Sequence, residues 1–133
     1  MCRLMWVFAF LLLLSGIAGC GDNTTEADRI GVGGQCTDSA QCPAEMEIEL
    51  ECLIQFKGGY CGLEGCEGDI DCPEGSACVI HDDGMNYCFR ICRDKPECNY
   101  NRSLENESNC SANIVFAEAP QDRKACVPPS SGI

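Results

Sequence analysis

Residues 66–88, CEGDIDCPEGSACVIHDDGMNYC, carry the pattern on which the fold depends. The first two of their four cysteines stand six positions apart, and a proline follows the second. Asp82-Asp83-Gly84 lies between two runs with apolar residues, 77–81 and 85–90. Because Asp-Gly favours a tight turn, this stretch predicts a β-hairpin preceded by an irregular loop.

The same cysteine pattern occurs before and after this stretch. Aligned on their spacing, twelve cysteines form three groups of four with a constant first gap: Cys36-x5-Cys42-x9-Cys52-x8-Cys61, Cys66-x5-Cys72-x5-Cys78-x9-Cys88 and Cys92-x5-Cys98-x11-Cys110-x15-Cys126. Tyr60-Cys61 also matches Tyr87-Cys88. A repeat of roughly 30 residues indicates internal duplication.

Each of the other two groups is expected to form a similar hairpin. In the first, apolar residues alternate with polar ones over residues 45–56, which predicts one strand with a wet face that turns back at residues 57–60. In the third, strands over 114–116 and 124–127 would flank a turn at 119–122.

An isolated hairpin is marginal in water, so each loop must be held to its hairpin. Spacing alone leaves three ways to pair the cysteines of each group. Joining the first to the third and the second to the fourth achieves this, and it is favoured here. It gives Cys36–Cys52, Cys42–Cys61, Cys66–Cys78, Cys72–Cys88, Cys92–Cys110 and Cys98–Cys126. A crossover between groups near Cys88 and Cys92 is the main alternative.

The predicted fold class is therefore a small disulfide-rich protein of β-hairpins and loops in three tandem cysteine-rich units. The expected organisation is a signal peptide (1–19), a flexible tether (20–35), three units (36–61, 66–88 and 92–126) and a tail (127–133). Leu, Ile, Val and Phe make up only 19 of residues 20–133. With so thin a core, disulfides worth roughly 3 kcal/mol each must supply the stability, and the reduced chain is expected to unfold.

The N-terminus has the form of an export signal. Arg3 precedes an apolar stretch, Leu4 to Ala18, that is shorter than the roughly 20 residues of a membrane-spanning helix. Its ending, Ile17-Ala18-Gly19-Cys20, resembles the lipobox of bacterial lipoproteins, which implies cleavage before Cys20 and a covalent lipid on its thiol. Ordinary cleavage after Ala18 is the alternative.

Cysteine parity bears on that choice. Of the 14 cysteines, Cys2 leaves with the signal, and lipid on Cys20 leaves twelve, an even number. In lipoproteins an Asp after the lipidated cysteine often retains the protein at the inner membrane. Gly21 stands there in this chain, so the resemblance implies an exported lipoprotein of a Gram-negative outer membrane.

The repeated unit, Cys-x5-Cys-Pro-x-Gly-x-x-Cys with a later Tyr-Cys, resembles the cysteine-rich repeats of lipoproteins in myxobacteria and related Gram-negative bacteria. Residues 66–88 fit this form best. A weaker likeness exists to the cysteine-rich repeat of Dickkopf proteins. The resemblance implies an exported, disulfide-bonded module without an assigned activity.

The charge balance limits the partners. The net charge is −12, which argues against nucleic acid and keeps the chain off anionic membrane surfaces. The row Glu45, Glu47, Glu49 and Glu51 is interpreted as a solvated strand face. A cationic protein or surface is the partner that such a row could attract.

Signals for catalysis and for metal binding are weak. The chain has no Cys-x-x-Cys pair for redox chemistry, and its single histidine, His81, falls beside a turn and suits neither a zinc site nor a catalytic base. Asp69, Asp71 and Glu74 are weak calcium candidates because they offer hard oxygen ligands, although their spacing does not fit a calcium loop. No other metal or cofactor is expected besides the lipid on Cys20.

The leading interpretation is a lipid-anchored, non-enzymatic binding or spacer module, with membrane contact through its anchor. A protease-inhibitor or toxin-like mini-protein is the alternative, with residues 99–109 as the loop that would enter a partner's cleft. The sequence specifies neither the ligand nor the oligomeric state.

Overall fold

The computed structural model of the chain describes residues 25–45 and 47–130. Within these ranges the fold has one short helix, α1 (Glu26–Ile30), and otherwise consists of strands, turns and loops. The strands are β1 (Ala44–Glu45), β2 (Ile48–Glu49), β3 (Glu51–Cys52), β4 (Cys61–Gly62), β5 (Ser76–Ile80), β6 (Asn86–Arg90), β7 (Asn109–Ser111), β8 (Val115–Phe116) and β9 (Ala125–Val127). Four 3-10 turns complete the elements: η1 (Ser39–Gln41), η2 (Asp69–Asp71), η3 (Pro96–Asn99) and η4 (Leu104–Asn106). The predicted fold class, a disulfide-rich protein of strands and loops, is confirmed.

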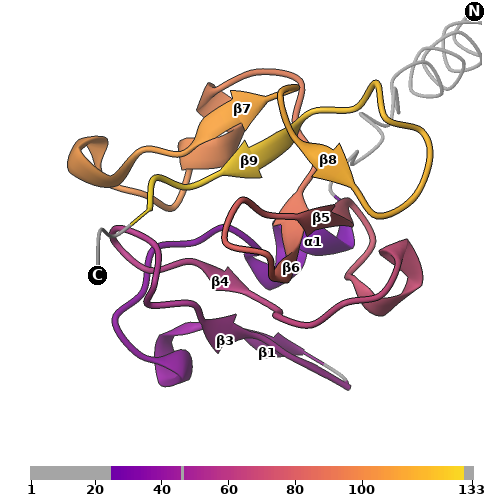
Figure 1. Cartoon of the computed structure of the whole chain (residues 1–133). Coiled ribbons are helices and arrows are strands. Elements are labelled where there is room, and N and C mark those ends of the chain that lie inside the picture. The colour runs from indigo at the N-terminus through magenta and orange to yellow at the C-terminus, as the bar shows by residue number, and fades with distance from the viewer. Residues whose placement is uncertain (1–24, 46, 131–133) are drawn as a thin grey trace, which may run out of the picture.

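The strands form four small antiparallel sheets. Three are two-stranded, β1–β2, β3–β4 and β7–β9, and the fourth has the order β6-β5-β8. The hairpin of β5 and β6 lies in the middle of the molecule, between the strands of the first cysteine group and those of the third (Figure 1).

The central β5–β6 hairpin forms as predicted. Cys78 pairs with Cys88 in its register, and its turn lies at residues 82–84. Gly84 adopts a left-handed backbone conformation with φ of +85°, which few other residues adopt at low cost.

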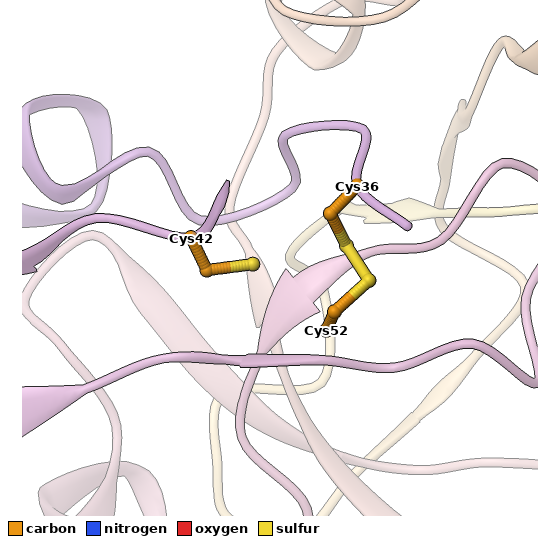
Figure 2. Close-up of side chains that lie close together, drawn as sticks. All are labelled: Cys36, Cys42 and Cys52. Carbon is orange, nitrogen blue, oxygen red and sulfur yellow. A yellow bond between two sulfur atoms is a disulfide. The ribbon is translucent and has the colours of Figure 1, made fainter. Parts of the chain in front are cut away.

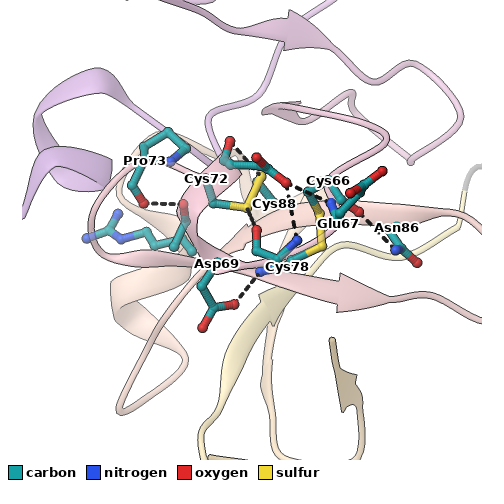
Figure 3. The surroundings of a disulfide bond; sticks show 12 residues. Cys66, Glu67, Asp69, Cys72, Pro73, Cys78, Asn86 and Cys88 are labelled. Carbon is teal, nitrogen blue, oxygen red and sulfur yellow. Dashed lines mark hydrogen bonds between the residues drawn. A yellow bond between two sulfur atoms is a disulfide. The ribbon is translucent and has the colours of Figure 1, made fainter. Parts of the chain in front are cut away.

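Six disulfides join the first cysteine to the third and the second to the fourth within every group. This is the pairing favoured from the spacing, without a crossover between groups. Each second-to-fourth bond and each first-to-third bond fastens the loop at the start of a unit to the paired strands that follow. Figure 3 shows the two bonds of the second group, Cys66–Cys78 and Cys72–Cys88, side by side.

The three cysteine groups share one hydrophobic core. The largest buried side chains come from the first group (Phe56, Tyr60), the second (Tyr87, Phe89) and the third (Phe116). Ring centroids of the Phe56–Tyr87 and Tyr60–Phe89 pairs are both 5.1 Å apart. A unit of about 25 residues cannot bury enough apolar surface alone, so the units pool their few aromatic residues.

Tyr60 ties the three groups together. Its side chain is fully buried, and its hydroxyl donates to the carbonyl of Cys126 and accepts from the backbone N–H of Arg90, each at 3.2 Å. Burial raises the pKa of this phenol well above its ordinary value of 10.0. The hydroxyl therefore stays protonated and holds one polar contact to each of the other groups.

Residues 25–34 correct the expectation of a flexible tether over 20–35. Thr25 and Asp28 form a reciprocal capping box at the start of α1, and Gly31 ends the helix with φ of +87°. Ala27 and Ile30 are fully buried. The backbone N–H of Ala27 also donates to the carbonyl of Glu74 at 2.6 Å. The helix is therefore packed against the second group, and residues 20–24 lie outside the described residues.

The single strand expected over residues 45–56 is broken into β1, β2 and β3. β1 and β2 form a short hairpin, in which Ala44 pairs with Glu49, and only β3 pairs with β4. Leu50, Leu53 and Phe56 are buried, three residues apart, whereas Ile54 is 63% exposed. The period of two fails because the chain turns after Cys52 to bury Leu53 beside Tyr60.

The predicted hairpin of 114–116 with 124–127 is also wrong. β8 pairs with β5 of the second group, and β9 pairs with β7 across the Cys110–Cys126 register. Phe116 is buried in the shared core, and the guanidinium of Arg123 lies 4.4 Å from its ring centroid. Burying this phenylalanine in the core draws β8 away from its own group.

Residues 127–130 do not form part of the tail expected over 127–133. Lys57 donates its backbone N–H to the carbonyl of Pro129 at 2.9 Å, and Phe56 forms a β-bridge with Ser130. These contacts fasten residues 127–130 to the first group. Residues 131–133 lie outside the described residues.

Candidate functional site

The cysteine sulfurs gather in three tight clusters, and every cysteine in the described ranges is disulfide-bonded. The sulfur atoms of Cys36, Cys42 and Cys52 lie within 4.8 Å of one another, and Figure 2 shows the Cys36–Cys52 bond beside Cys42. The partner of Cys42 is Cys61. Metals and redox substrates require thiolates, so the oxidised clusters act as structural crosslinks.

The calcium candidates are not brought together. Both carboxylate oxygens of Asp69 are engaged, one accepting from the N–H of Cys78 at 3.0 Å and the other pairing with Arg123 at 2.7 Å. Asp71 caps η2 by accepting from the N–H groups of residues 67 and 68, and Glu74 is exposed. Among the described residues, the close triples of potential ligands consist of cysteines alone. Asp69 and Asp71 therefore serve the folding of this loop, and Figure 3 shows Asp69 beside Cys78.

The glutamate row of the first group does not lie along one strand. Glu47, Glu49 and Glu51 are exposed, and the break between β2 and β3 divides them. Glu45 belongs to β1, opposite Ile48. Glu47, Glu49 and Glu51 therefore lie on the solvated surface of two short hairpins rather than along one continuous strand.

His81 is part of the aromatic packing around Phe56. Its ring centroid lies 5.3 Å from that of Phe56 and 5.7 Å from that of Tyr87, and its Nδ1 lies 3.3 Å from a carboxylate oxygen of Asp83. The same carboxylate group accepts from the Tyr87 hydroxyl at 2.8 Å. These contacts hold the histidine at the base of the central hairpin's turn, which is a structural position.

The loop of residues 99–109, the inhibitor-loop candidate, is braced from inside. Arg102 donates to the carbonyl oxygens of Gly33, Lys57 and Gly59 at 3.2, 2.8 and 2.8 Å. Asn99 and Ser108 hydrogen-bond across the base of the loop. The short turns η3 and η4 shape the loop, which therefore does not present a long extended segment to a partner.

A cleft lies where α1 meets the end of β6 and the start of the third group. Its volume is about 840 Å³. Its functional side chains are Thr25, Asp28, Arg90, Arg93, Glu97, Tyr100 and Arg123. We call it the arginine cleft, because three of the nine basic residues of the chain line it.

The arginines of this cleft differ in the exposure of their side chains. Arg90 is largely buried and forms an ion pair with Asp28 of α1. Arg93 pairs with Glu97 through two contacts of 2.8 and 2.9 Å, yet 92% of its side chain is exposed. The backbone N–H of Arg93 also donates to Glu97 and, with the guanidinium, lowers the pKa of that carboxyl.

Tyr100 completes the cleft. Its side chain is 72% exposed, and the guanidinium of Arg90 lies 5.9 Å from its ring centroid. An exposed aromatic ring beside guanidinium groups suits anionic or interfacial ligands better than apolar molecules.

Sequence reasoning missed this cleft. Residues 90–102 hold Arg90, Arg93, Lys95 and Arg102, which is four of the nine basic residues in a strongly acidic chain. That local reversal of charge is the signal that could have identified it. Asp28 and Arg123 come from distant segments, and only the fold brings them to it.

The proposed lipidation site, Cys20, lies outside the described residues. Within the described ranges, no helix combines the length and the apolar character that crossing a bilayer requires. Comparison of the chain with family models, with curated proteins and with solved structures gives no match. Its function is therefore argued from its own residues.

Proposed function

We propose that this chain is an exported lipoprotein, anchored through lipid on Cys20, whose disulfide-bonded domain is a non-enzymatic binding or spacer module outside the inner membrane. The six disulfides are the observation that carries the proposal. Such a density of disulfides is typical of proteins that fold in oxidising compartments, and it replaces a large hydrophobic core.

The number of cysteines left outside the disulfides supports a lipid anchor at Cys20. All twelve cysteines between Cys36 and Cys126 are paired within the domain. Cys2 and Cys20 are the two that remain. Cleavage before Cys20 removes the first, and a lipid thioether consumes the second, so no free thiol is left in an oxidising space.

A binding or spacer role agrees with the geometry of the domain. One core shared by the three groups, together with six disulfides, fixes the groups relative to one another. The arginine cleft is a recess of about 840 Å³, and its charged side chains favour recognition of a charged ligand.

Mass spectrometry of the full chain expressed in a Gram-negative host tests the proposal. The protein extracted from membranes should begin at residue 20, carry diacylglyceryl and acyl mass on Cys20, and weigh about twelve hydrogens less than its reduced form. Sucrose-gradient separation should place it with the outer membrane. An unmodified N-terminus or several free thiols would overturn the proposal.

Two variants make the assignment specific. Cys20→Ala should abolish the acyl mass and the membrane fractionation, whereas the matched variant Cys2→Ala should leave both unchanged. A panel of secreted proteases addresses the inhibitor alternative. Inhibition at low micromolar concentration would replace the binding-module interpretation, and absence of inhibition is the expected result.

A further inference from the structure

The segment that joins the proposed lipid site to the folded domain, here called the leash, is much shorter than the tether of residues 20–35 that the sequence predicts. Because α1 is packed into the core from Thr25 onward, only residues 20–24 separate the proposed lipid site from the folded domain. Five steps of extended chain span about 17 Å. A domain of this size has a radius of gyration of about 13 Å, hence a diameter of about 33 Å. The leash therefore cannot let the domain turn its α1 end away from the bilayer.

The arginine cleft is at this end of the domain. Thr25, where the leash enters, lines the cleft together with Asp28 of the same helix. Figure 1 shows α1 beside β5 and β6, and β6 supplies Arg90. Anchoring at Cys20 therefore keeps Thr25, and with it this edge of the cleft, within about 17 Å of the lipid site.

Its chemistry differs from that of the remaining surface. The chain carries 21 acidic and 9 basic residues, yet the cleft is lined by three arginines and two acids, Asp28 and Glu97. Arg93 and Tyr100 are its most exposed charged and aromatic side chains. Tyrosine is enriched at membrane interfaces, and arginine pairs with phosphate in a two-pronged geometry.

We propose that the arginine cleft is the membrane-contact face of the anchored domain, in which Arg93 pairs with the phosphate of phospholipid headgroups and Tyr100 lies at headgroup depth. This inference rests on the proposed anchor at Cys20. Zwitterionic headgroups carry the phosphate without adding net negative charge, so the acidic remainder of the domain is not repelled. The second signal complements the acyl anchor and fixes the orientation of the domain.

Chemical anchoring tests the orientation without cellular lipidation. In the oxidised chain starting at residue 20, Cys20 is the single cysteine outside the six disulfides, so its thiol can be coupled to a maleimide lipid in phosphatidylcholine vesicles. The sole tryptophan, Trp6, is absent from this chain. Tyr100→Trp therefore places a unique fluorophore in the cleft, and Ile54→Trp places one at an exposed apolar position of the first group.

The expected result is a contrast between these two positions. Brominated phosphatidylcholine should quench the tryptophan at position 100 at least twofold and leave the one at position 54 nearly unchanged. Equal quenching at both positions, or at neither, would overturn the inference.

A charge reversal tests the phosphate contact. Arg93→Glu should reduce the quenching at position 100 by at least half, whereas Lys57→Glu, an equal charge change in the first group, should not. No effect of Arg93→Glu would overturn the role of Arg93. Loss of quenching on adding inorganic phosphate would overturn the lipid as ligand and identify a free-phosphate site.

Failure of this inference and failure of the proposed function can be told apart by experiment. If mass spectrometry shows that cells do not lipidate Cys20, the proposed function fails, whereas the vesicle experiment still reports the preference of the cleft.

Discussion

Substituting Ile30 tests whether the segment after the leash belongs to the folded domain. Ile30 ends α1 and is fully buried in the shared core. Ile30→Ala removes three carbon atoms, which corresponds to about 2.4 kcal/mol at about 0.8 kcal/mol per methylene group. The cavity left behind adds to this loss, and the better helix propensity of alanine offsets a few tenths of a kcal/mol. We expect a destabilisation of about 3 kcal/mol.

Guanidinium unfolding of the oxidised chain measures this loss. Near-ultraviolet circular dichroism of the buried tyrosines, Tyr60 and Tyr87, reports the packing of the core. For a slope of about 3 kcal/mol per molar guanidinium, the midpoint should fall by about 1 M.

The matched control is Ile70→Ala, which removes the same atoms from a side chain that is 94% exposed. Its midpoint should correspond to a change within about 0.5 kcal/mol. If Ile30→Ala is no more destabilising than Ile70→Ala, residues 25–34 are a tether after all. The short leash and the orientation derived from it would then be wrong.

Two further predictions concern the buried hydroxyl of Tyr60 and the disulfides. Tyr60→Phe leaves a buried carbonyl and a buried N–H without their partner and should cost about 2 kcal/mol at pH 7 in thermal unfolding. Burial raises the pKa of Tyr60 above 10.0, so the stabilisation by its hydroxyl is complete below pH 10 and is lost as the pH rises further. The difference in unfolding free energy between wild type and Tyr60→Phe should therefore narrow by about pH 11. A difference that stays constant with pH would contradict this prediction. Replacing Cys98 and Cys126 together by Ala should lower the free energy of unfolding by about 3 kcal/mol, because this bond spans a sequence separation of 28. Full reduction of all six disulfides should abolish the near-ultraviolet signal. A cooperative transition that survives reduction would show that the core suffices without crosslinks.

Local patterns predicted part of the fold correctly. The central hairpin follows from Asp82-Asp83-Gly84, because a tight turn depends on neighbouring residues alone. The within-group pairing follows from a similarly local requirement, because each loop must be held to the hairpin that follows it in the chain. The capping box at Thr25 was equally local, although the glycine-rich surroundings obscured it.

The incorrect predictions all involve contacts between groups. The alternation over residues 45–56 predicted one strand, but Leu53 and Phe56 turn inward to meet aromatic rings supplied by the second group. β8 was expected beside β9 and instead pairs with β5. Periodicity reports which residues prefer burial, and it does not report which distant element will cover them.

The same division holds for the candidate site. The sequence by itself determined the disulfide-rich class, the central hairpin and the expectation of a lipid anchor at Cys20, since each depends on residues close together in the chain. Only the tertiary structure decided that the three groups share one core, that residues 25–34 belong to the folded domain, and that Arg90, Arg123 and Asp28 line one cleft. A thin core forces this outcome, because groups too small to bury their own aromatic residues become stable only by packing them against one another.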